Sequence, residues 1–151
     1  MKYQLLTSKT LDKKTDCLVL GVWDRTGLDA PSDMLAPAVH EQCTAIIKSG
    51  DIKGKSGETL LVHSPVKAAA SRILLVGLGD KNKFDGKTYR KVVRATAQAL
   101  NRTPAKTALL RLVQLPVTNR DATWATTQLV TELGNAQYRY DQTKSKKADK
   151  P

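Results

Sequence analysis

The chain has 151 residues, which is enough for one domain with a proper hydrophobic core and too few for two. Lysine and arginine number 25 against 14 aspartate and glutamate residues, a formal net charge of +11, and a field of that sign attracts polyanions whatever their sequence. No apolar run approaches the ~20 residues that span a bilayer, and the first residues lack a signal-peptide pattern, so we expect no membrane partner and a cytoplasmic location.

The first half of the chain alternates strand and helix patterns. A short strand is predicted at Tyr3–Thr7, and the continuous apolar run Cys17–Val22 is typical of a strand covered on both faces. A loop over Trp23–Pro31 leads to a helical pattern from about Ser32 to Ser49, which Gly50 can end. The apolar stripe of this helix comprises Val39, Cys43, Ile46 and Ile47.

The second half continues the alternation. Strands are predicted at Thr59–His63, Arg72–Val76 and Ala108–Leu115, with a helix over about Lys87–Asn101 between the last two. A final helix can be capped by Asn119 or Asp121 and carries apolar residues at Ala122, Ala125, Leu129, Leu133, Ala136 and Tyr140. Strands that alternate with helices predict a layered α/β domain with a mostly parallel or mixed sheet.

A glycine-rich segment nearly matches the phosphate-loop pattern. Gly54, Lys55 and Ser56 fit its end, but Ser49 stands where the first glycine belongs, with Gly50 one residue late. A helix pattern precedes the segment and a strand pattern follows, which is the reverse of a phosphate loop. We therefore interpret it as a glycine-rich hairpin turn, and we interpret the later Gly77-Leu78-Gly79 as a tight turn from strand to loop.

Local patterns for catalysis are scarce. His40 and His63 are 23 residues apart, and neither belongs to a metal-ligand spacing. Asp51 and Glu58 could serve as a carboxylate pair, but solvated loop charges are the favoured interpretation. The cysteines, Cys17 and Cys43, fall inside apolar patterns and are predicted to be buried thiols rather than a disulfide.

Three segments together resemble the N-terminal domain of the leucyl (cytosol) aminopeptidase family. They are the G-D-x-x-G-K-x-G-E-T-L-L run at Gly50–Leu61, the R-I-L-L-V-G-L-G run at Arg72–Gly79, and Y-R-Y-D-Q-x-K-S-K-K at Tyr138–Lys147. Their order and spacing fit that family across nearly the whole chain. The family-motif positions with an expected structural role are Gly50, Asp51, Gly54, Lys55, Gly57, Glu58, Gly77 and Gly79.

This resemblance implies a macro-domain-like three-layer fold, with an accessory domain over residues 1–140 and a basic interdomain linker over 141–151. It implies a longer parent enzyme in which two divalent metal ions, manganese or zinc, act in a C-terminal catalytic domain. That domain is absent here, so no catalytic or metal-binding residue and no cofactor is assigned to this chain. Its implied partners are that catalytic domain and further copies of itself in a homohexamer.

Two alternative functions remain open. A basic stripe on the second predicted helix, extended by the loop before it, could follow the phosphates of DNA without reading sequence, although a solvated helix face explains it more simply. Its residues are Lys81, Lys83, Lys87, Arg90, Lys91 and Arg94. The other alternative is a macro-like ADP-ribose binder, because Gly50-Asp51-Ile52 matches part of a G-D-I-T element; Lys53 breaks the match, and a glycine-rich diphosphate loop is hard to find.

Overall fold

The computed structural model describes residues 2–5, 14–29, 35–63, 65, 70–113 and 115–134, the first of these ranges by its backbone alone. The predicted boundary between residues 1–140 and the linker 141–151, the motif Tyr138–Lys147, and the helix positions Ala136 and Tyr140 lie outside these ranges. None of the helices in the described ranges is both long and apolar enough to cross a membrane.

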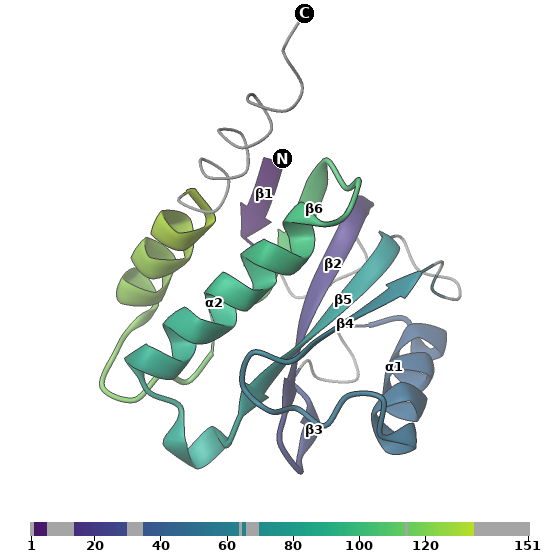
Figure 1. Ribbon diagram of the computed structural model, residues 1–151, viewed down its shortest axis with the longest axis horizontal. Coiled ribbons are helices and arrows are strands. Elements are labelled where there is room, and N and C mark those ends of the chain that lie inside the picture. The colour runs from purple at the N-terminus through teal and green to yellow at the C-terminus, as the bar shows by residue number, and fades with distance from the viewer. Residues whose placement is uncertain are drawn as a thin grey trace, which may run out of the picture.

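A six-stranded sheet forms the middle layer (Figure 1). Its main strands run in the order β1-β6-β2-β5-β4, and the short β3 pairs antiparallel with β2. All neighbours along the main order are parallel except β4 and β5, so the predicted mixed, mostly parallel sheet is confirmed. The strands are β1 Lys2–Leu5, β2 Thr15–Trp23, β3 Gly27–Leu28, β4 Thr59–His63, β5 Ala70–Gly79 and β6 Thr107–Leu110.

Helices cover both faces of this sheet. Successive residues of β2 point to opposite faces, so Val19 packs in a different apolar cluster from its neighbours Leu18 and Leu20. Helix α1, Pro37–Ser49, packs on the Leu18 face, whereas α2, Gly86–Asn101, packs on the Val19 face (Figure 1). A final helix over residues 122–134 lies beside α2. The result is the three-layer α/β architecture that the sequence analysis predicts.

Helix boundaries differ from the predicted ones where capping chemistry decides them. Helix α1 begins at Pro37, not near Ser32, because the residue before a proline disfavours helical backbone; Ala36 is extended there, with ψ 138°. The final helix takes Asp121 as its cap: the Asp121 carboxylate accepts the backbone N–H of Trp124 at 2.9 Å.

Strand boundaries differ where pairing partners decide them. Strand β5 continues through Gly79, so the predicted turn at Gly77-Leu78-Gly79 is wrong; these residues stay in the strand beside the end of β2. Strand β6 stops at Leu110, not Leu115, because its pairing with β2 ends there. Leu112 and Leu115 are nevertheless buried, since they pack against the α2 face as irregular chain.

The aromatic side chains that the structure describes are concentrated in one line within the α2 cluster. The ring of Phe84, the only phenylalanine, lies edge-on to Trp23 at 5.0 Å between centroids and to Tyr89 at 6.1 Å. Tyr89 in turn contacts Trp124 at 5.6 Å. The buried Tyr89 hydroxyl donates to the backbone carbonyl of Leu112 at 3.0 Å. This line joins the end of β2, α2 and the final helix into one unit.

Both cysteines are free and fully buried, one on each face of the sheet, as the sequence analysis predicts. Burial raises the pKa of the Cys17 thiol and of the Cys43 thiol to about 11. An exposed thiol titrates near pH 8.5. The folded pKa is therefore above the unfolded one, and the stability contributed by the protonated thiols is complete below about pH 8.5 and is lost as pH rises towards 11.

We expect the free energy of unfolding, measured by urea denaturation, to fall between pH 9 and pH 11, and less steeply in the Cys17→Ala/Cys43→Ala variant. A disulfide-type thiol reagent should label neither cysteine at pH 8 until denaturant is added. Rapid labelling of the native chain would contradict the burial of these thiols.

Candidate functional site

The family-motif residues Gly50–Glu58 form a loop that connects α1 to β4, and we call it the glycine loop. Gly50 ends α1 in the left-handed conformation, with φ 86°, and its N–H donates to the Ile47 carbonyl. The segment is therefore a helix-to-strand connection, and the predicted hairpin turn is wrong. The hairpin in this region joins β4 and β5, which pair antiparallel after the glycine loop has ended.

The glycine loop folds around the carboxylate of Glu58. One carboxylate oxygen accepts three successive backbone N–H groups, those of Lys53, Gly54 and Lys55, at 3.0–3.1 Å. Such a row of N–H groups is a ready anion site in other proteins. Here the chain's own carboxylate fills it, which explains why the near match to a phosphate loop does not make one. Glu58 is thus a structural anchor, not the solvated charge predicted, while Asp51 is exposed.

The glycine loop also lies directly against the end of β5. The N–H of Gly57 donates to the Gly77 carbonyl at 3.0 Å, and the N–H of Gly79 donates to the Gly54 carbonyl at 2.7 Å. A side chain at Gly77 would place its Cβ 2.0 Å from the Lys55 carbonyl oxygen, which no real structure tolerates. Gly54, Gly57, Gly77 and Gly79 therefore meet in space, and they allow the two backbones to approach closely.

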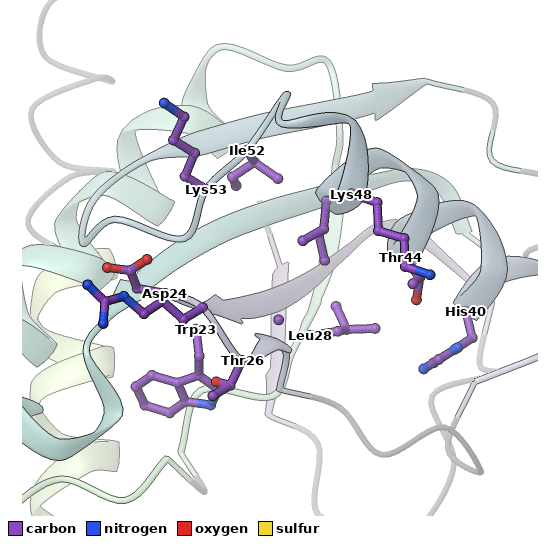
Figure 2. A pocket seen from close by; sticks show the side chains of 12 residues that line it. Trp23, Asp24, Thr26, Leu28, His40, Thr44, Lys48, Ile52 and Lys53 are labelled. Carbon is purple, nitrogen blue, oxygen red and sulfur yellow. The ribbon is translucent and has the colours of Figure 1, made fainter.

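A pocket of about 630 Å³ opens between the glycine loop, α1 and the turn that joins β2 to β3 (Figure 2). His40, Thr44 and Lys48 follow one another at intervals of four residues along one side of α1 and line it. Leu28 lies in the middle of the view, and Ile52 is on the glycine-loop side. The sequence analysis missed this pocket, although the polar stripe on the predicted first helix was a signal for it.

Two chemically different groups of residues line this pocket. Leu28, Ile47 and Ile52 are aliphatic, and Ile52 is fully buried. Arg25, Lys48 and Lys53 carry full positive charges and are exposed, and the lining includes one carboxylate, that of Asp24. His40, one of the two histidines considered above, lies here, whereas His63 is exposed at the end of β4.

An ion pair fixes the chain beside the turn between β2 and β3. The Asp29 carboxylate accepts the Trp23 indole N–H at 2.8 Å and pairs with the Arg111 guanidinium, and both partners are largely buried. Because Arg111 follows β6 and Asp29 follows β3, this contact ties together two segments that are far apart in sequence.

The predicted basic stripe lies on the face of the sheet opposite α1. Its helical members are separated from the buried stripe of α2, and the two remaining lysines belong to η2, a short 3-10 turn over Lys81–Lys83. Five of the six are exposed and Arg90 is partly buried. The six residues are Lys81, Lys83, Lys87, Arg90, Lys91 and Arg94.

Two residues of this stripe are bound by polar side chains of other elements, and Lys81 lies 5.8 Å from the centre of the Trp23 ring. Arg94 forms a two-pronged ion pair with Glu132 of the final helix, with N–O distances of 3.0 and 3.1 Å. The Lys91 ammonium donates to the Ser56 hydroxyl at 3.3 Å, which brings the glycine loop next to α2. The continuous cationic stripe seen in the sequence is therefore interrupted.

An aromatic ring joins the basic surface from another element. Two guanidinium groups lie near the ring of Trp124 in the final helix: that of Arg120, 5.1 Å from the ring centre, and that of Arg90, at 6.0 Å. Trp124 is far from the stripe in sequence, and only the tertiary structure brings its ring there. Within the described residues, no three His, Cys, Asp or Glu side chains are grouped so that they could hold a metal ion.

Comparison with known proteins decides the family. Residues 19–147 match the model of the cytosol aminopeptidase family, N-terminal domain. The chain belongs to the cytosol aminopeptidase family. It is 36% identical over 146 residues to a probable cytosol aminopeptidase of Nitrosospira multiformis, covering 97% of this chain and 28% of that relative. The chain spans under a third of the length of the curated cytosol aminopeptidases it matches first.

Solved structures agree on the fold of this domain. A mutant of tomato leucine aminopeptidase matches with a TM-score of 0.56 and 19% identity, over 88% of this chain and 28% of that one. The macrodomain of Mycobacterium tuberculosis DarG matches with a TM-score of 0.66 and 12% identity, over 88% and 90%. At such identities the likeness shows the fold alone, and it confirms the macro-domain-like architecture without favouring the ADP-ribose alternative.

We expect Gly77→Ala to lower the free energy of unfolding by about 2 kcal/mol or more, because the new methyl group must displace the glycine loop backbone. Gly134→Ala is the matched control, since a Cβ there meets nothing within 4 Å, and its stability should be unchanged or slightly higher. Urea denaturation of both variants tests this. Equal stabilities would mean that the close contact of the two segments is not needed.

Proposed function

We propose that this chain is the non-catalytic N-terminal part of a longer, metal-dependent aminopeptidase that removes N-terminal residues from peptides. The observation that carries the proposal is the match of residues 19–147 to the N-terminal domain of the family, at about 28% of a relative's length. Metal chemistry, with two ions of manganese or zinc, then belongs to the C-terminal catalytic domain.

The domain would act by supporting assembly in the cytoplasm. We propose that it docks on its own catalytic domain and helps to build a homohexamer, with residues 141–151 as the linker. The hydrogen bonds between the glycine loop and β5, and the ion pair between α2 and the final helix, support such a role, because they fix how these elements lie at the surface. The net charge of +11 would be partly balanced by a more acidic catalytic domain.

The test is the size and activity of the natural product. An antibody raised against this chain should capture a protein much heavier than 16.5 kDa that releases leucine from a leucine amide reporter when Mn²⁺ or Zn²⁺ is present. The 151-residue chain alone should remain inactive with either ion. A captured protein of 16.5 kDa without activity would contradict the proposal and indicate a stand-alone domain.

We propose polyanion binding, with DNA as the probe, as a second candidate function of the basic surface. The observation that favours it is the Trp124 ring with Arg90 and Arg120 beside it, because arginine and aromatic faces together suit nucleic-acid backbones and bases. Lys81, Lys83 and Lys87 are exposed beside them. Contacts of this kind tolerate any sequence and weaken steeply as salt rises.

We expect Lys87→Ala/Arg90→Ala to weaken DNA binding and to lower the slope of log affinity against log salt by about 1–2. Arg94→Ala, the control, should change both much less because Glu132 already holds that guanidinium. Fluorescence anisotropy over a salt series measures these quantities. An affinity that does not change from low to moderate salt would rule out this function.

A further inference from the structure

We infer that the pocket between α1 and the β2–β3 turn binds an organic anion, a carboxylate carried on a short aliphatic group. The pocket volume of about 630 Å³ falls within the range of roughly 300–1,000 Å³ that small-molecule sites occupy. This inference goes beyond the proposed function and does not depend on it. It rests on the two groups of lining residues and on the backbone of Arg25.

The aliphatic group would lie against the wall of the pocket. Leu28, Ile47 and Ile52 come from three different elements, β3, α1 and the glycine loop, and all line it. Ile52 is fully buried and forms the base of the wall, so the half-buried Leu28 and Ile47 supply the apolar surface that a ligand can reach. An apolar surface of this kind favours a ligand that brings its own apolar group out of water.

The carboxylate would be held at the mouth of the pocket. Arg25, Lys48 and Lys53 line it with three positive charges, and Asp24 contributes one negative charge, which leaves an excess of two. Thr44, on the same side of α1 as Lys48, adds a hydroxyl donor. An excess of positive charge around an apolar wall attracts anions and repels cations of the same shape.

The backbone of Arg25 points to a role for its side chain. Arg25 has φ 72° in the turn between β2 and β3, a left-handed conformation that glycine adopts far more easily than arginine. Gly27, two residues later, has φ 86°. A left-handed backbone at a charged residue is strained, and strain of this kind often occurs where a side chain contacts a ligand.

Two kinds of molecule carry a carboxylate on a short aliphatic group: a free organic acid and the C-terminal residue of a peptide. Hexanoate represents the first and N-acetyl-leucine the second, while N-acetyl-leucinamide has the shape of the second without its charge. Each is titrated into the 151-residue chain at low salt, and backbone amide shifts are followed by NMR. We expect saturable shifts at residues 25–28 and 44–53 with a carboxylate, and much weaker ones with the amide.

The carboxylate that binds more tightly, hexanoate or N-acetyl-leucine, identifies which of these two kinds of molecule the pocket prefers. If neither carboxylate gives saturable shifts at these residues, or if the neutral amide binds as well as N-acetyl-leucine, the inference is wrong. The first result would mean that the pocket does not bind such a ligand. The second would mean that the charges of the pocket do not contribute to binding.

Charge-removing variants test the proposed residues. Lys48→Gln/Lys53→Gln should weaken carboxylate binding about tenfold, whereas Lys83→Gln/Lys87→Gln, with the same loss of charge away from the pocket, should change it less than about twofold. Equal losses in the two variants would indicate a general field effect and overturn the assignment of this site.

Arg25 offers a test that separates binding from folding. Arg25→Gly should weaken carboxylate binding while the thermal midpoint is unchanged or higher, because glycine suits the φ of 72°. Arg25→Lys, which keeps the charge, should retain most of the affinity. If Arg25→Gly binds carboxylates as tightly as the unaltered chain, Arg25 is not part of the site.

Discussion

The close contact between the glycine loop and the end of β5 is the constraint on which the rest of this domain depends. The two backbones approach so closely that a single methyl group at Gly77 would overlap the Lys55 carbonyl oxygen. Hydrogen bonds from Gly57 and Gly79 close the contact, and the Glu58 carboxylate holds the loop from within by accepting three N–H groups. Because this loop leads from α1 to β4, its position fixes Ile52 in the pocket wall. It also fixes where β4, the edge strand of the sheet, begins.

Charge in this protein is organised by tertiary contacts more than by sequence order. The basic stripe of α2 is continuous along the helix, yet Glu132 pairs with Arg94, and Lys91 bonds to Ser56 of the glycine loop. On the opposite face of the sheet, Lys48 and Lys53 come from separate elements and line the same pocket. An exposed ion pair such as Arg94–Glu132 adds little stability, so its main effect is to decide which cations stay available to a partner.

Strand and helix patterns in the sequence were sufficient for the layered α/β fold, since buried parallel strands are continuous apolar runs and helices carry periodic stripes. The run at Cys17–Val22 and the stripe of Tyr89, Val92 and Val93 both became core. Ends of elements were harder to predict. Whether Leu112 continues a strand depends on a pairing partner, and whether Gly79 ends one depends on the neighbouring β2, and neither is visible in a local pattern.

The sequence by itself determined the family, through three spaced motifs, and the order of strands and helices, through apolar periodicity. It also determined that both cysteines are buried, because each stands in an apolar pattern. Only the tertiary structure decided what the motif glycines and Glu58 do, because their partners are backbone groups brought near by folding. The same is true of the pocket, whose lining from Arg25 to Lys53 acquires its shape and charge when β3, α1 and the glycine loop pack together. Non-local contacts, which no sequence window contains, set these features.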